Sequence, residues 1–217
     1  TLDLSRNKLT SIPDALTFYN LPILEELSIG GNPIRNLTFK SELRLRKLIL
    51  RNLDLLKTIE IHAFRHLKGV NDGCINLTVS ENRRLNVIEN GAFDGIAICY
   101  LDISKNAFTR ISSAAIKSAG KFVAQKGIDL QMNPFNCDCE SQWMLNDLVP
   151  HLYKINAELL EDLRCNSPPE LAGTRMVHWF AWKKRVFCDT SPQVLSKMTV
   201  DTSAVLIGSR TTIRLEP

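Results

Sequence analysis

The sequence predicts an α/β solenoid, in which short strands from successive repeats stack into one parallel sheet. The first observation is the run 101–111, where an alternating apolar strand ends at Asn106 and continues into an apolar turn. The second is that this pattern restarts at residues 2, 27, 48, 77, 101 and 128, at spacings of 25, 21, 29, 24 and 27 residues. Self-similarity at this period is typical of solenoids. The third is a hydrophobic content of 44% over 217 residues, enough for a substantial core.

The alternation within each repeat predicts which side chains form the core. Neighbouring side chains of a strand point to opposite faces, so Leu101 and Ile103 face inward while Asp102 and Ser104 face solvent. One repeat cannot bury its apolar row alone, but stacked repeats share a continuous interior. We therefore expect one aligned row of inward residues, namely Leu4, Ile29, Leu50, Val79, Ile103 and Leu130.

An asparagine ends nearly every strand. Its side-chain amide can satisfy backbone groups that the turn would otherwise bury unpaired. We expect a ladder along one edge of the stack, formed by Asn7, Asn32, Asn82, Asn106 and Asn133. Leu53 interrupts this ladder, with Asn52 one place away, so a local irregularity is expected there.

The segments that return along the opposite, convex side are short. They leave room for a helical turn or a 3₁₀ piece, except that residues 112–125 have the composition of a longer helix. Equivalent apolar turn positions should extend the core, at Ile12, Leu37, Ile59, Ile88 and Ile111. Phe64 and Phe93 recur at one depth and predict a short stacked row beneath the convex surface.

A cysteine-rich segment follows the last strand. It begins Asn133-Pro134-Phe135-Asn136-Cys137-Asp138-Cys139 and continues with Trp143, Cys165, Pro168-Pro169, Gly173 and Cys188. Together with the repeats, this motif resembles the C-terminal cap of extracellular leucine-rich-repeat proteins. The resemblance implies a right-handed, curved β–α superhelix whose parallel sheet lines the concave face. It also implies a helical cap over the last repeat and the disulfides Cys137–Cys165 and Cys139–Cys188, whereas the sequence alone allows three pairings of these four cysteines.

Cysteine usage and two sequons predict an oxidising, extracellular compartment. Cys74 and Cys99 lie at the starts of consecutive repeats, with Cys99 one step past Ile98, the residue that matches Cys74. Neighbouring strands lie within reach of a disulfide, so we favour a Cys74–Cys99 bridge over two buried thiols. Asn36 and Asn76 are candidate N-glycosylation sites, and a glycan on Asn76 would cover the middle of the concave face.

The outward strand positions predict a mostly small, polar concave face with few large anchors. Its candidate ligand-binding residues are Tyr100, Asp102, Ile49, Arg51, Lys105 and Asp129. Tyr100, Ile49 and Met132 are its plausible energetic hot spots. On the cap, Trp179 and Trp182 precede three consecutive basic residues, Lys183-Lys184-Arg185. That segment is compatible with a partner or glycosaminoglycan site, or with aromatic packing beneath solvated charges.

Several functional classes are disfavoured. A net charge of +4 with mixed signs is too mild to indicate a nucleic-acid partner. His62 and His66 stand four residues apart without a third ligand in the sequence nearby, and the uneven gaps between the cap cysteines argue against zinc. The sequence presents no Ser/His/Asp set, carboxylate pair or phosphate-binding loop in a recognisable context. We therefore expect neither an enzyme nor a cofactor.

The predicted organisation is six repeats over residues 1–133, a cap over 134–189, and a tail over 190–217. The chain opens inside a repeat and is interpreted as a fragment. The tail resembles the first strands of an immunoglobulin-like domain, but a linker or strands packed on the cap stay open.

The family resemblance implies a secreted or single-pass cell-surface protein that recognises a protein ligand or co-receptor in adhesion or signalling. The alternatives are a matrix protein that assembles through its edges, including as a homodimer, and a Toll-type innate-immune ectodomain.

Overall fold

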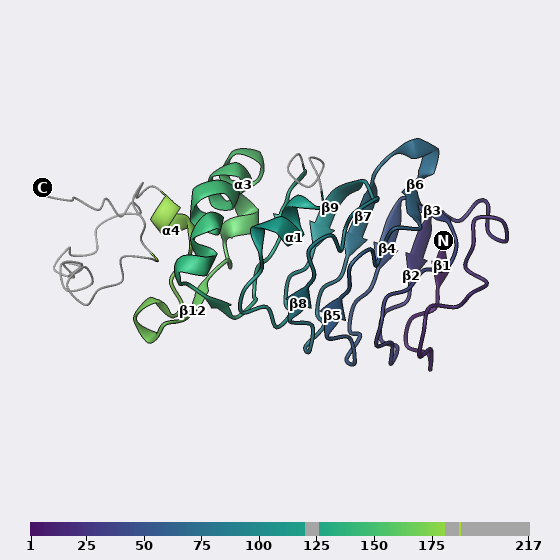
Figure 1. The fold of residues 1–217 in the computed structure, drawn as a ribbon, viewed down its shortest axis with the longest axis horizontal. Helices are drawn as coiled ribbons and strands as arrows, with labels where there is room; N and C mark the ends of the chain where they lie inside the picture. The colour runs from purple at the N-terminus through teal and green to yellow at the C-terminus, as the bar shows by residue number, and fades with distance from the viewer. Residues whose placement is uncertain (120–125, 181–186, 188–217) are drawn as a thin grey trace, which may run out of the picture.

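The computed structural model describes residues 1–119, 126–180 and 187. The strands lie side by side along the long axis of the molecule, from the N-terminus toward a helical segment near the other end (Figure 1). Among the described residues, no helix is both long and apolar enough to cross a membrane.

The repeats build one six-stranded parallel sheet. Its strands, in spatial order, are β1 (Leu2–Asp3), β2 (Glu26–Ser28), β4 (Lys47–Ile49), β7 (Ile75–Thr78), β9 (Ile98–Asp102) and β10 (Ile128–Asp129). The register places the first residue of every repeat opposite its equivalent, in the file Leu2, Leu27, Leu48, Leu77, Leu101 and Ile128. This confirms the solenoid prediction.

The core runs directly behind the sheet. Ile29, Leu50, Val79, Ile103 and Leu130 are at most 1% exposed, as the alternation predicts. Leu4 is only half-buried because β1 is the end strand and has one neighbour. The five apolar turn residues expected to extend the core are all buried.

The asparagine ladder is present. Asn106 accepts a hydrogen bond from the Asn82 backbone N–H at 2.8 Å and donates to the carbonyls of Val79 and Ile103, each at 2.8 Å. Asn32, Asn82 and Asn133 make equivalent bonds. Leu53 breaks the ladder as predicted, since its side chain accepts nothing. The expected irregularity is confined to this lost link, because β4 keeps its register with both neighbours.

The residue before each ladder position has a left-handed backbone. These residues are Arg6, Gly31, Asn52, Glu81, Lys105 and Met132, with φ between 54° and 67°. Glycine and asparagine tolerate this conformation best. Asn52 therefore occupies its own structural position, the left-handed turn, and is not a displaced ladder residue.

The convex side carries less helix than the sequence suggests. Two additional two-stranded parallel ladders join β3 (Leu43–Leu45) to β6 (Leu67–Gly69) and β5 (Thr58–Ile59) to β8 (Val87–Ile88). The helical elements whose bounds are described in 1–133 are η1 (Val70–Asp72) and α1 (Ser113–Lys117), and Lys126 is also helical. The Ser112 hydroxyl caps α1 by accepting the Ala115 N–H at 3.0 Å, but residues 120–125 of the expected longer helix lie outside the described residues.

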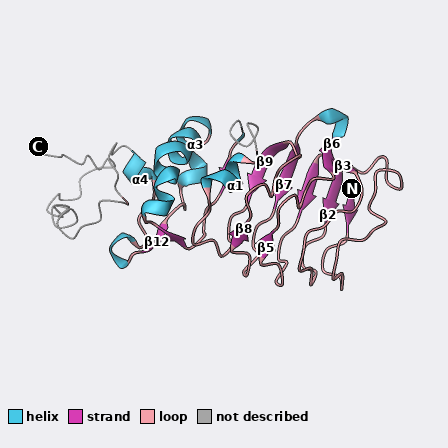
Figure 2. Cartoon of the chain, in the orientation of Figure 1, coloured by secondary structure: helices cyan, strands magenta, loops and turns pink. Residues whose placement is uncertain are grey.

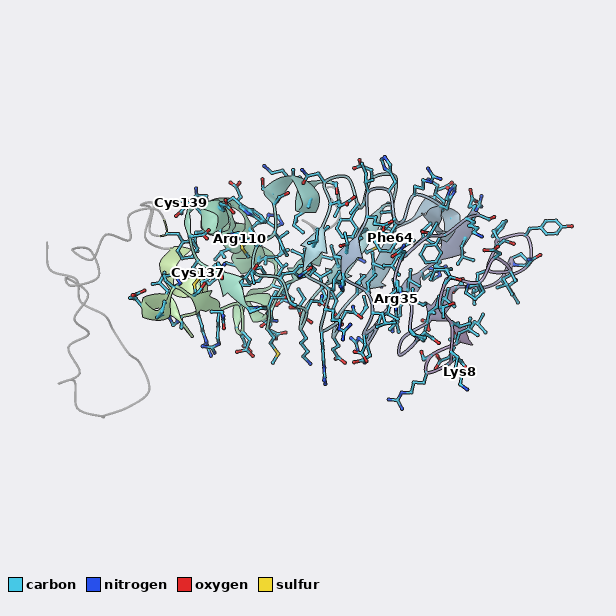
Figure 3. All side chains as sticks on the ribbon, turned by 60° about the horizontal axis from the view of Figure 1, so that its bottom comes forward. Lys8, Arg35, Phe64, Arg110, Cys137 and Cys139 are labelled. Atoms are coloured by element: carbon cyan, nitrogen blue, oxygen red, sulfur yellow. A yellow bond between two sulfur atoms is a disulfide. The ribbon has the colours of Figure 1, made fainter. Side chains whose placement is uncertain are left out.

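The predicted phenylalanine row is present, and it is longer than expected. Phe64 stacks on Phe93 with ring centroids 5.7 Å apart and planes within 5°. On its other side, Phe39 lies 6.4 Å away at 39°. In Figure 3, Phe64 lies within the body of the stack, whereas Lys8 lies at its lower edge.

Residues after the last repeat form the cap, where most of the helix is gathered (Figure 2). Its elements are β11 (Phe135–Asn136), η2 (Cys139–Ser141), η3 (Met144–Leu148), α3 (Val149–Ile155), η4 (Ala157–Leu160), β12 (Cys165–Ser167), η5 (Pro169–Leu171) and α4 (Val177–Phe180). The strand β11 pairs with β12, and the Cys137–Cys165 disulfide joins the same two segments. Met144, Val149 and Leu152 of the cap helices are fully buried and belong to the same core as the repeats.

Polar contacts attach the cap to the preceding repeat, including the Asn136 N–H donating to the Thr109 carbonyl at 2.8 Å. The Trp143 indole N–H donates to the Ile111 carbonyl at 3.0 Å. Arg110 pairs with Asp138 and, at 3.1 Å, with Glu140. Cys139 is itself disulfide-bonded, while Cys188, its implied partner, lies outside the described residues, as do Trp182 and the tail 190–217.

The Cys74–Cys99 disulfide is also present, with Cα atoms 5.0 Å apart. The strand register predicted from the sequence is wrong by one residue at this point, because Ile75 and not Cys74 pairs with Ile98. The next aligned pair is Asn76 with Tyr100, so Cys99 is an extra residue in β9. This local bulge lets Cys99 turn toward Cys74 while the rest of the sheet keeps its register.

Candidate interaction face

The side of the six-stranded sheet that faces away from the core is here called the concave face. Its central column is the one the sequence predicts: Asp3, Ser28, Ile49, Thr78, Asp102 and Asp129 stand in register. Several of these polar residues are nevertheless buried. Thr78, Ser80, Asp102 and Ser104 are each at most 8% exposed, so the face is less open than alternation alone implies.

The burial arises from a hydrogen-bonded network centred on Asp102. Arg51 reaches across β7 and donates to Ser80 Oγ at 3.2 Å and to Asp102 Oδ2 at 3.3 Å. Ser80 donates to the same oxygen at 2.9 Å, and the Ser104 hydroxyl donates to Oδ1 at 2.7 Å. Asp102 therefore orders Arg51 and two serines, and its carboxylate has little capacity left for a ligand.

A hollow of about 620 Å³ lies on the cap side of this network. It is lined by Lys47, Arg51, Asn76, Thr78, Ser80, Glu81, Tyr100, Asp102, Ser104, Lys105, Asp129, Gln131, Met132 and Asp162. A second hollow of about 590 Å³ lies toward the N-terminal strands and is bordered by Ile49. The structure thus brings five of the six predicted concave-face residues to one hollow, and Arg51 borders both.

Tyr100 is the aromatic residue among the described residues that line the first hollow, and it is half-buried. Partial burial raises the pKa of its hydroxyl from the ordinary 10.0 to about 12, with further contributions from the carboxylates of Asp129 and Asp102. The hydroxyl therefore stays protonated at physiological pH and can donate a hydrogen bond. Tyrosine combines a rigid apolar ring with such a polar tip, which suits it to interfaces.

Asp129 belongs to β10, the last strand of the sheet, and lies beside Tyr100 of the neighbouring strand β9. Its Oδ1 accepts the Gln131 backbone N–H at 2.9 Å, which holds the side chain in place. Burial raises the pKa of the Asp129 carboxyl, and the nearby Asp102 carboxylate adds to the shift. The hollow thus holds a partly desolvated acid at its cap end.

The cap contributes to this hollow in a way that the repeats do not reveal. Asp162 lines it, and its backbone N–H donates to the Gln131 side-chain oxygen at 2.7 Å. The Met132 backbone N–H in turn donates to the Asp162 backbone carbonyl at 3.1 Å. Asp162 lies 31 residues beyond Gln131 in the chain, outside any repeat, so no sequence pattern places it here.

The asparagine of each sequon is exposed on the folded surface. Asn76 is an outward residue of β7, aligned with Lys47 and Tyr100, and lines the first hollow. Asn36 lies in an inter-repeat segment outside both hollows. Of the other predicted positions, His62 is exposed, and His66 accepts a hydrogen bond from Arg65 at 3.0 Å. Trp179 belongs to α4, but its side-chain environment is not described.

Comparison with known proteins agrees with this geometry. No protein-family model matches the sequence. The CD180 antigen of Mus musculus is 31% identical over 181 residues, which is 81% of this chain and 26% of that protein. The stacked repeats and the asparagine ladder identify the fold, and the similarity to this relative agrees with them. The chain is an extracellular leucine-rich-repeat protein.

The chain spans about a quarter of the length of that curated relative. Human 5T4, the Wnt-activated inhibitory factor 1 or trophoblast glycoprotein, has a solved structure that aligns with a TM-score of 0.42. Its sequence identity is 15%, over 86% of each chain. The assignment to the leucine-rich-repeat family rests on the repeats and the mouse relative, not on this structural similarity.

Proposed function

We propose that this leucine-rich-repeat chain is an extracellular recognition module of a cell-surface receptor or adhesion protein. Its first hollow binds a protein ligand non-covalently. The observation that carries the proposal is the ordered network of Arg51, Ser80 and Asp102 beside a half-buried tyrosine. Side chains held before the ligand arrives lose little conformational entropy on binding, which favours affinity.

Three further observations support this role. The disulfides Cys74–Cys99 and Cys137–Cys165 fit an oxidising, extracellular compartment. The chain is 31% identical to the mouse CD180 antigen over 181 residues. The hollow joins a large aromatic, a thioether and charges of both signs, a composition suited to a protein partner.

The experiment is affinity capture from cell-surface and secreted proteins with this chain, followed by affinity measurement on the captured ligand. We expect Tyr100→Ala to weaken binding by about 1–2 kcal/mol, because it removes the central aromatic contact. Tyr19→Ala is the matched control, since Tyr19 is 92% exposed in the segment between β1 and β2. Unchanged affinity in Tyr100→Ala would contradict the proposal and direct attention to the Trp179–Arg185 segment.

Glycosylation of Asn76 is expected to oppose binding at this hollow. A glycan there would occupy space beside Lys47 and Tyr100, so Asn76→Gln should raise ligand affinity by roughly fivefold, about 1 kcal/mol. Asn36→Gln removes the other sequon and should leave affinity unchanged. Intact-mass measurement establishes which sites carry glycan, and equal affinity of both variants would count against the hollow as the binding site.

A further inference from the structure

Charge pairing within the first hollow leaves one carboxylate, Asp129, without an ion pair; it interacts with Lys105 only at longer range, because Lys105 pairs with Glu81. Glu81 lies 3.7 Å from Lys105, Asp102 lies 3.3 Å from Arg51, and Asp162 lies 3.0 Å from Arg164. Among the described residues, no lysine, arginine or histidine nitrogen lies within 4 Å of the Asp129 carboxylate. Its hydrogen-bonding partners are the neutral backbone and side-chain amides of Gln131.

This difference does not follow from sequence position. Asp3, Asp102 and Asp129 occupy the same column, and each accepts the backbone N–H of the residue two places later, at 2.8, 3.1 and 2.9 Å. Asp3 is exposed at the far end of the sheet, and Asp102 is neutralised by Arg51. Asp129 alone in this column combines partial burial with a carboxylate that makes no ion pair within 4 Å among the described residues.

We infer that the cap end of the hollow binds an arginine side chain of the protein ligand, with Asp129 as its counter-ion. The inference rests on the proposed function, which it deepens by naming the chemistry of the partner. An incoming guanidinium meets the Asp129 carboxylate, the Tyr100 ring and hydroxyl, and the Met132 thioether in one hollow. Its planar group can pair with a carboxylate and lie against an aromatic face together, which a compact ammonium does less well.

A metal ion fits this place less well than an arginine. Divalent cations such as calcium need six or more oxygen ligands. In the described part of the chain, no three histidine, cysteine, aspartate or glutamate side chains are grouped so that they could hold a metal. Asp102 and Asp162 are already engaged by arginines, so a single organic cation matches the one available carboxylate.

The test uses N-acetyl-arginine amide as the probe, titrated into the full isotope-labelled chain and followed by NMR. N-acetyl-citrulline amide is the control ligand, because its urea has the same shape without the charge. We expect saturable shifts at Tyr100, Gln131 and Met132 with the arginine probe only. Asp129→Asn should weaken this binding about tenfold, since the amide keeps the Gln131 cap but removes the charge.

Asp3→Asn is the matched protein control, because it makes the same change in the same column and should leave probe affinity unchanged. Equal shifts with citrulline, shifts at other residues only, or unchanged binding by Asp129→Asn would each overturn the inference. Affinity measurements on the captured protein ligand distinguish failure of the arginine site from failure of the proposed recognition function. A ligand that needs Tyr100 but tolerates Asp129→Asn would refute the arginine site and leave the recognition function standing.

Discussion

Phe64→Ala is expected to lower the free energy of unfolding by about 4 kcal/mol. The Phe64 side chain is fully buried, and its ring lies between Phe39 and Phe93 in the row that joins three repeats. Truncation removes the apolar surface, leaves a cavity, and breaks two aromatic contacts at once. Chemical denaturation with the disulfides intact, followed by circular dichroism, measures the change.

Phe18→Ala is the control for this prediction. Phe18 is half-buried, and its ring lies under the Arg44 guanidinium at 4.5 Å from the ring centroid. Its loss should cost about 1 kcal/mol, because it removes an exposed cation–π contact and little core packing. Similar losses in the two variants would show that the phenylalanine row is not a stabilising feature of the stack.

Asn106→Ala is expected to lower the free energy of unfolding by about 3 kcal/mol. The Asn106 side chain makes three hydrogen bonds, one with the Asn82 N–H and two with the Val79 and Ile103 carbonyls. Asn106 is only 7% exposed, so water cannot fully replace the lost partners. Buried backbone groups without partners carry most of the cost, and denaturant titration of the purified variant measures it.

Asn7→Ala tests the role of burial in this effect. The Asn7 amide donates to the Leu4 and Ser5 carbonyls at 2.9 and 3.2 Å, but it lies at the exposed end of the ladder. Water can reach those carbonyls after truncation, so the expected cost is below about 1 kcal/mol. If Asn7→Ala destabilised the chain as much as Asn106→Ala, the ladder would act through local turn geometry instead of burial.

The repeats were predictable because the alternation of apolar and polar residues within each strand is enough to show which side chains face the core. Alternation identified the buried row from Ile29 to Leu130 and the outward column from Asp3 to Asp129, since both depend only on positions within a repeat. The register at Cys99 was not predictable in the same way. An extra residue in β9 shifts the phase of the alternation, so Ile98 and Leu101 both face inward three residues apart, and only the pairing with β7 shows which residue is the extra one.

The candidate site likewise combines features that the sequence predicts with features that only the folded structure shows. The sequence alone determined which residues reach the concave face, including Arg51, Tyr100 and Asp129. Only the tertiary structure decided that Arg51 neutralises Asp102, that the cap brings Asp162 to the hollow, and that Asp129 makes no ion pair while Lys105 pairs with Glu81. The physical reason is that facing direction is a local property of the strand, whereas charge pairing and burial depend on distances between residues of different repeats.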